Sequence, residues 1–165
     1  ALVGRQPEAD LETMLERGGL IWMLAGAQYQ TNIGYCIRVA EVSGANGLIV
    51  TGEWSSDDRH RIIRAAMKTN RFMPVVLGGD GLEILESWKG RVIAIEDVGT
   101  EEPWDADLTG DVILIIGGEK DGISEELLGA ADQAIRIPMA GFTPSYNLQA
   151  PMAVVAVEAL RQRRS

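Results

Sequence analysis

Three segments of the sequence carry side chains or glycines of the kind that form ligand sites. The first, TNIGYCIRVAEVSGANG (31–47), contains Asn32 and Arg38. If a helix begins at Asn32, which is a good capping residue, Arg38 follows about 1.7 turns later. Both side chains can then face the C-terminal edge of a parallel sheet, where open α/β folds bind their ligands. Taken alone, this segment is explained better by a capped helix with one exposed arginine.

The second segment, ILIIGGEKDGISEE (113–126), places glycines directly after an apolar run. Gly117 and Gly118 precede the acid Glu119, and Gly122 follows before a helical pattern. Glycines at a strand end let the backbone turn sharply and let a ligand approach main-chain groups. When the segment is considered alone, a plain strand–turn–helix connection is the better explanation.

The third segment, IPMAGFTPSYNLQ (137–149), follows another apolar run and contains two prolines and a glycine. The side chains that it offers for chemistry are Ser145 and Asn147. Because it leads into a long Ala- and Val-rich helical pattern, the simplest interpretation is a strand end followed by a helix that Asn147 caps.

Charge is unevenly distributed along the chain. The formal net charge is −9 at pH 7, which by itself argues against a nucleic-acid partner. Between residues 59 and 71, however, a stretch that we call the basic segment contains no acid and five cations: Arg59, Arg61, Arg64, Lys68 and Arg71. This basic segment is either a solvated helix face or a surface that binds anions such as RNA phosphates.

Several common sites are not supported by the sequence. It contains no GxxxxGK[ST] phosphate loop, no GxGxxG after its first predicted strand and no GxSxG nucleophile motif. Cys36 is the one cysteine and His60 the one histidine, so an internal disulfide is excluded and no metal site is expected. A lone cysteine is typical of a reducing compartment, and we therefore expect a cytoplasmic protein.

Apolar runs and amphipathic stretches alternate along the chain and predict its elements. Continuous apolar strands between helices predict an α/β fold with a mainly parallel sheet that is covered by helices on both faces. The predicted strands span 20–25, 47–51, 74–77, 91–96, 111–118 and 133–139, and the predicted helices span 7–17, 32–42, 58–69, 81–88, 123–132 and 147–163.

The length of 165 residues fits one domain, with residues 1–19 as a helical lead-in. The loop VGTEEPWDADLTG (98–110) is the longest irregular stretch, and loops of this length are often functional. No apolar run approaches the roughly 20 residues of a membrane span, and neither a signal peptide nor a separate RNA-recognition domain is visible.

Together, the three segments are more specific than any one of them. In order they read N-x-G-x-x-x-R-x-A-E-x-x-G, then G-x-E-x-x-G-I-S, then I-P-M-x-G-x-x-x-S-x-N before an Ala/Val-rich helix. This ordered triple resembles the SpoU (TrmH-type) RNA ribose 2′-O-methyltransferases of the SPOUT superfamily. The resemblance covers residues 20–161, which is nearly the whole chain.

The resemblance implies a fold and a reaction. Members of the family are α/β domains whose C-terminal part forms a deep trefoil knot; they bind S-adenosylmethionine in the knot and work as homodimers to which the last helix contributes. The reaction would be attack of a ribose 2′-hydroxyl in tRNA or rRNA on the sulfonium methyl group, aided by proximity and alignment. By position, the catalytic residues would be Asn32, Arg38, Glu119, Ser145 and Asn147. The cofactor-binding residues would be Gly117, Gly118, Ile137, Met139, Tyr146 and Leu148.

The role of Arg38 and three departures from the family pattern limit how directly the family's activity can be carried over to this chain. Because a guanidinium is protonated at neutral pH, we expect Arg38 to position the hydroxyl and the adjacent phosphate through forked hydrogen bonds. Tyr146 stands where Leu is usual, Gln149 where a second Ser is usual, and Gly118 where Asn or Ala is frequent. Two alternatives therefore stay open: a catalytically weak or inactive relative that binds cofactor and RNA, and another small-molecule-binding α/β protein.

Overall fold

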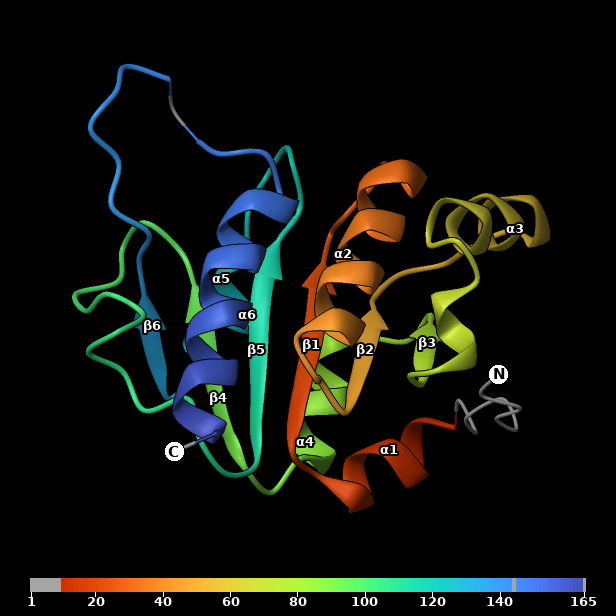
Figure 1. Cartoon of the computed structure of the whole chain (residues 1–165), viewed down its shortest axis with the longest axis horizontal. Helices are drawn as coiled ribbons and strands as arrows, with labels where there is room; N and C mark the ends of the chain where they lie inside the picture. The colour runs from red at the N-terminus through yellow and green to blue at the C-terminus, as the bar shows by residue number, and fades with distance from the viewer. Residues whose placement is uncertain (1–9, 144, 165) are drawn as a thin grey trace.

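The computed structural model of this protein describes residues 10–143 and 145–164 and contains one β-sheet. Six strands form one sheet in the order β3-β2-β1-β5-β4-β6, and all neighbouring strands are parallel (Figure 1). The predicted parallel α/β sheet is therefore confirmed. The strands are β1 (Leu20–Ala25), β2 (Gly47–Val50), β3 (Val75–Leu77), β4 (Arg91–Ile95), β5 (Val112–Gly117) and β6 (Gln133–Ile135).

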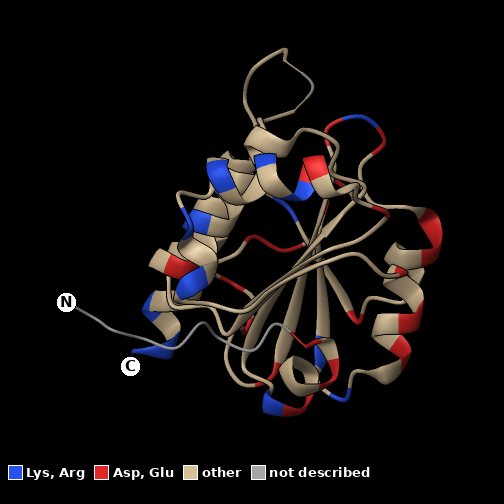
Figure 2. Cartoon of the chain, turned by 90° about the vertical axis from the view of Figure 1, so that its right-hand side faces the viewer, with Lys and Arg blue, Asp and Glu red and all other residues tan. Residues whose placement is uncertain are grey.

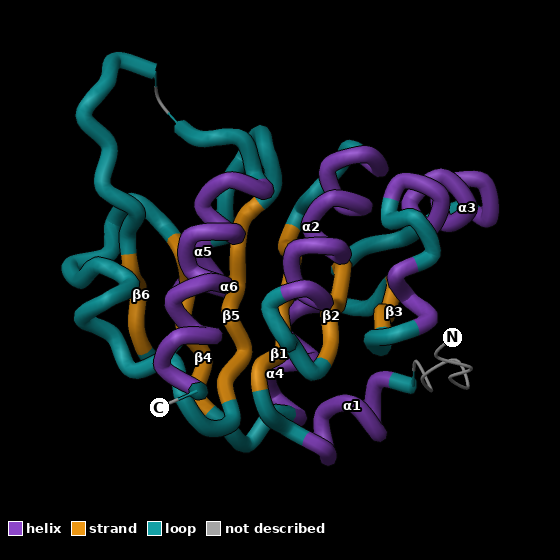
Figure 3. Tube along the Cα trace, in the orientation of Figure 1, coloured by secondary structure: helices purple, strands orange, loops and turns teal. Residues whose placement is uncertain are grey.

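Helices cover both faces of the sheet, as the unbroken apolar strands predict. Along β1, Trp22 and Leu24 pack into one core and Ile21 and Met23 into the other, because successive strand residues point to opposite faces. In Figure 3, α2 and α6 lie side by side over the central strands. The first core is completed by α2 (Gln30–Val42), α3 (Ser56–Ala65) and α6 (Gln149–Arg163), and the second by α1 (Leu11–Arg17), α4 (Gly81–Ser87) and α5 (Glu125–Gly129).

Helices α2 and α3 have boundaries that differ from the prediction. Helix α2 begins at Gln30, and the residue before it makes no side-chain cap, so Asn32 lies inside the first turn and does not cap the helix. Helix α3 ends at Ala65 rather than near residue 69, because Met67 and Lys68 adopt positive φ angles of 53° and 61°. Such left-handed residues end a helix, and a short 3₁₀ turn, η1 (Thr69–Arg71), follows.

The C-terminal elements are shorter than predicted. Strand β6 ends at Ile135 rather than at residue 139, because the N–H of Arg136 donates to the oxygen of Glu101 in the loop 98–110 at 2.9 Å, and Pro138 offers no N–H for a longer ladder. Helix α5 spans five residues instead of the predicted 123–132 and is capped by Ser124. Helix α6 begins at Gln149 with no side-chain cap, so the predicted capping by Asn147 is wrong. The predicted residues 7–9 of the first helix lie outside the described residues.

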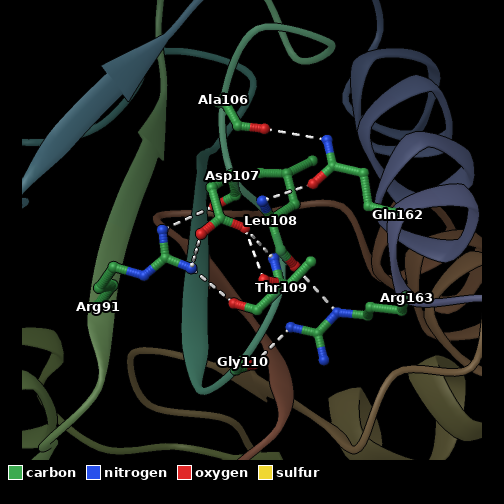
Figure 4. Close-up of polar contacts among 8 residues, drawn as sticks. All are labelled: Arg91, Ala106, Asp107, Leu108, Thr109, Gly110, Gln162 and Arg163. Carbon is green, nitrogen blue, oxygen red and sulfur yellow. Dashed lines mark hydrogen bonds and ion pairs between the residues drawn. The ribbon is translucent and has the colours of Figure 1, made fainter. Parts of the chain in front are cut away.

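The second half of the loop 98–110 is anchored by side chains of β4 and α6 (Figure 4). Gln162 accepts a hydrogen bond from one loop N–H at 2.8 Å and donates to a loop carbonyl at 2.9 Å. Arg163 donates to two loop carbonyls at 2.9 and 2.6 Å, and Arg91 to two more at 2.8 and 2.6 Å. These bonds satisfy backbone groups that have no strand partner. This part of the loop therefore fastens the end of α6 at the N-terminal edge of the sheet.

Candidate active site

A cavity of about 600 Å³ lies at the C-terminal edge of β4 and β5. Its walls are the ends of these strands, the turn 117–122 and residues of the segment 137–148. Its volume falls in the range of pockets that hold small-molecule ligands and cofactors. All six residues for which cofactor contact is predicted line this cavity: Gly117, Gly118, Ile137, Met139, Tyr146 and Leu148.

The glycines of the turn after β5 are required by close packing. A Cβ atom on Gly117 would lie 2.3 Å from the carbonyl carbon of Gly122, and one on Gly118 would lie 2.0 Å from the backbone oxygen of Gly26. Gly118 also donates its N–H to the oxygen of Ala25 at 2.7 Å. No side chain fits at either position, so the backbone itself forms this wall of the cavity.

Three of the predicted catalytic residues form one hydrogen-bonded cluster. The amide nitrogen of Asn32 donates to Glu119 Oε1 at 2.7 Å and makes a longer contact of 3.4 Å with Asn147 Oδ1. The other carboxylate oxygen of Glu119 accepts from the backbone N–H of Gln28 at 3.2 Å, and Asn147 Oδ1 accepts from the N–H of Leu148 at 3.0 Å. The cluster thus joins α2, the turn after β5 and the start of α6 beside the cavity, which Glu119 and Asn147 line.

The other two predicted catalytic residues are placed differently. Ser145 is exposed and lines the cavity. Arg38 is exposed on α2, and in the described part of the chain no hydrogen bond or ion pair joins it to the cluster. Six helical residues turn the side-chain direction by roughly 240°, so Arg38 and Asn32 leave α2 on different sides. One chain therefore does not bring Arg38 into the cluster.

The two unusual residues of the third segment differ in how their polar groups are satisfied. Tyr146 is half exposed, and its hydroxyl donates to the backbone oxygen of Pro138 at 3.2 Å, which closes the segment on itself. Tyr146 thus forms part of the cavity wall. Gln149 begins α6, and its side-chain oxygen is buried without a hydrogen-bond partner among the described residues.

The basic segment forms a solvent-exposed surface on α3, η1 and the turn between them, and all five of its cationic residues are exposed. One contact is an ion pair of Arg61 with Asp57 at 4.0 Å, and another is a hydrogen bond from Arg59 to the backbone oxygen of Trp54 at 3.1 Å. In Figure 2, Lys and Arg gather on the helices over one face of the sheet, and Asp and Glu on those over the other. The charge is therefore distributed unevenly between the two faces, although α3 and α6 also carry acids such as Asp57 and Glu158, and the net charge conceals this imbalance.

Sequence reasoning missed the acidic part of the cavity wall. Glu96, Asp97 and Asp121 line the cavity together with Glu119, whereas Lys120 is the one cation among the lining residues. The available signal was the position of Glu96 at the end of a predicted strand, since strand ends of a parallel sheet meet at one edge. A nearby smaller cavity of about 330 Å³ shares Asp97 with the first.

The described residues offer neither a membrane-crossing helix nor a cluster suited to a metal. No helix in residues 10–143 and 145–164 has the length and apolar character to cross a membrane. Within the same ranges, no group of three or more His, Cys, Asp and Glu side chains is arranged to hold a metal ion. Burial, helped by the charge of Glu119, raises the pKa of Cys36 to about 12, so this thiol is neutral at physiological pH.

A backbone-walled cavity at the C-terminal edge of a parallel sheet, with an amide–carboxylate cluster beside it, defines a small-molecule-binding α/β protein. The comparisons with known proteins make this class specific. Residues 19–157 match the model of the SpoU rRNA Methylase family. The chain therefore belongs to the SpoU rRNA methylase family, as the three ordered segments predict.

Relatives and solved structures extend this assignment. The chain is 31% identical over 162 residues to the 23S rRNA (guanosine-2′-O-)-methyltransferase RlmB of Pseudomonas syringae, covering 94% of this chain and 65% of the relative. It resembles the AdoMet-bound structure of the SpoU methyltransferase AviRb from Streptomyces viridochromogenes with 27% identity and a TM-score of 0.85, covering 96% and 63%. It also resembles the AdoMet-bound rRNA methyltransferase from Sinorhizobium meliloti, with 27% identity and a TM-score of 0.81. This match covers 92% of this chain and 59% of the solved chain. The chain thus spans less than two thirds of the length of these proteins.

Proposed function

We propose that this chain is the catalytic domain of an RNA methyltransferase that transfers a methyl group from S-adenosylmethionine to a ribose 2′-hydroxyl. The observation that carries the proposal is the Asn32–Glu119–Asn147 cluster beside a cavity that all six predicted cofactor residues line. The names of its relatives, 23S rRNA guanosine and uridine 2′-O-methyltransferases, favour ribosomal RNA over transfer RNA as the substrate.

The residues of the cavity suit S-adenosylmethionine. Ile137, Met139 and Leu148 offer an apolar wall to a nucleoside base, and the acidic wall suits a ligand with a sulfonium and an ammonium group. When bound, the cofactor supplies an electrophilic methyl group. Glu119 and Asn32 hold each other in place and fix the geometry of the cluster, so that a ribose hydroxyl can be aligned for attack. Ser145 and Asn147 present further polar atoms to the same space.

Arg38 and the exposed stripes of two helices support a homodimer. On α2, Tyr35, Arg38 and Val42 are exposed at helical spacing, and on the adjacent α6 Val154 and Val157 are 43% and 64% exposed. Such apolar exposure around a charged residue is typical of an interface between subunits. In the proposed dimer, this stripe of one subunit packs against the partner, and Arg38 completes a site that one chain leaves incomplete.

The dimer is tested by Val157→Glu, which places a charge within the stripe. Analytical ultracentrifugation should then show a monomer, with methyl transfer lost and cofactor affinity kept. Val98→Glu, at a residue that is 65% exposed and remote from these helices in the sequence, is the matched control. A Val157→Glu protein that sediments as a dimer would contradict this interface.

The basic segment is proposed to hold RNA phosphates. Its five cations are exposed on one side of the molecule, and each phosphate contact releases counterions, so RNA affinity should fall steeply with salt. Replacing Arg64 and Lys68 by Gln should weaken RNA binding and reduce the slope of log K against log salt by about 1–2. An unchanged slope would leave the segment as a solvated helix face.

The finer points of the family resemblance also belong to the proposal: one domain, a cytoplasmic location and a trefoil knot. The knot is supported by the path of the chain, which leaves β6 at the edge of the sheet and returns over β4 and β5 to place α6 against α2. Pulling on residues 10 and 164 of the unfolded chain tests it, since a tightened knot shortens the contour length. If the measured contour length equalled that of an unknotted chain, the proposed knot would be refuted.

Calorimetric titration with S-adenosylmethionine and S-adenosylhomocysteine tests the proposed function first. We expect micromolar binding, abolished by Met139→Trp, which fills the cavity, and kept in Phe142→Trp, on the same segment but fully exposed and away from the cavity. Methyl transfer to ribosomal and transfer RNA should follow. Binding without transfer to any RNA would favour the inactive relative, and no binding by folded protein would favour another small-molecule-binding protein.

A further inference from the structure

Glu96 stands where three walls of the cavity meet. It directly follows β4, and its backbone N–H donates to the oxygen of Ile135 at 2.9 Å, which joins the end of β4 to the end of β6. Its carboxylate oxygen Oε2 accepts from the backbone N–H of Ile123 at 3.2 Å, which joins it to the turn after β5. The main chain and side chain of one residue thus fix two separate walls.

Glu96 is also one of the residues that line the cavity. A Cβ atom on Gly122 would lie 3.1 Å from Oε2, so the carboxylate lies directly against the glycine turn. Among the described residues, the other oxygen, Oε1, has no hydrogen-bond partner. A carboxylate accepts hydrogen bonds through both oxygens, and Glu96 therefore has accepting capacity left for a ligand.

The two kinds of wall decide which part of the ligand reaches Glu96. Ile137, Met139 and Leu148 form an apolar wall, whereas Glu96 and the turn 117–122 form a polar one. A nucleoside carries a flat base and a sugar with two adjacent hydroxyls, so the base suits the first wall and the sugar the second. In other parallel α/β folds, an acid likewise accepts hydrogen bonds from ribose hydroxyls.

The geometry points to Glu96 as a cofactor-specificity residue whose carboxylate accepts hydrogen bonds from the ribose hydroxyls of the methyl donor. This inference rests on the proposed function, because it assigns a further contact within the same cofactor cavity. It makes Glu96 a binding residue with no part in methyl transfer itself. The bond is charge-assisted and partly shielded from solvent, so it should contribute about tenfold to affinity.

The test is a cycle of two proteins and two ligands, measured by calorimetry. Glu96→Gln keeps an oxygen that can accept from Ile123 and removes the charge. The ligands are S-adenosylhomocysteine and its 2′,3′-dideoxy analogue. We expect Glu96→Gln to weaken binding of S-adenosylhomocysteine about tenfold and to leave binding of the dideoxy analogue unchanged. Glu86→Gln makes the same chemical change at an exposed residue of α4 that does not line the cavity, and its effect on both ligands should stay within about twofold.

The outcomes separate this inference from the proposed function. Equal losses for both ligands in Glu96→Gln, or no loss for either, would overturn the hydroxyl contact while the wild-type affinity upholds the cofactor site. Equal losses in Glu86→Gln and Glu96→Gln would overturn it as well, because the effect would then be one of overall charge. If the folded wild-type protein bound neither ligand, the proposed function itself would be overturned together with this inference.

Discussion

Asn32→Ala should slow methyl transfer without changing cofactor affinity. The substitution removes the 2.7 Å hydrogen bond to Glu119 Oε1, which leaves the backbone N–H of Gln28 as the remaining partner of this carboxylate. A hydrogen bond to a charged group contributes about 1.5–3 kcal/mol, and we take about 1.5–2 kcal/mol because the pair is only partly buried. If the cluster must keep its geometry during transfer, the rate should fall about 10- to 30-fold.

The assay is single-turnover transfer from radiolabelled S-adenosylmethionine to RNA, combined with calorimetry. Because Asn32 does not line the cavity, the dissociation constant of the cofactor should stay within about twofold. Gln28→Ala is the matched control, since it removes a neighbouring side chain but keeps the backbone N–H that bonds to Glu119. An unchanged rate in Asn32→Ala, or an equal loss in Gln28→Ala, would refute the assigned role of the cluster.

Three further predictions follow from single side chains. Arg38→Lys should lower the transfer rate about tenfold or more with cofactor binding unchanged, because a lysine cannot form two parallel hydrogen bonds; near-normal transfer would contradict the forked role. Native Cys36 should react with iodoacetamide at pH 8 about a thousandfold more slowly than the unfolded chain, since its pKa is raised from 9.0 to about 12. Because the thiol ionises more readily in the unfolded chain, the free energy of unfolding should decline as the pH rises from about 9 towards 12. Rapid labelling of native Cys36 would contradict both the slow reaction and this decline in stability. Gln162→Ala removes two hydrogen bonds to the loop before β5 and should lower the free energy of unfolding by about 2 kcal/mol in urea, whereas the exposed Arg164→Ala should change it by less than about 0.5 kcal/mol.

The parallel sheet was predictable because its strands are buried on both faces. Unbroken runs such as LIWMLA and VILIIG leave no polar side for solvent, and they require helices above and below. The capping side chains of Ser55 and Ser124 are likewise local signals, although the predicted helices, 58–69 and 123–132, begin at other residues than α3 and α5. The ordered triple of segments predicted the family for a related reason, because residue types and spacing survive in the linear sequence.

Other features depend on contacts that local patterns do not encode. Asn32 has the character of a capping residue, yet its side chain bonds to Glu119, which is 87 residues away. Helix α2 consequently begins two residues earlier with no side-chain cap. The loop 98–110 has the composition of a functional loop, yet its second half is bound by Arg91, Gln162 and Arg163. In both cases a distant partner decides what the side chain or the loop does.

The sequence by itself determined the fold class, the family and part of the cavity wall, namely the six residues predicted to contact the cofactor. Only the tertiary structure decided which of them meet. It brought Asn32, Glu119 and Asn147 together, left Arg38 on a separate surface, and placed Glu96 in the wall of the cavity. The physical reason is that secondary structure follows from neighbours along the chain, whereas a site forms where strand ends and helix starts converge, and that convergence depends on strand order and packing.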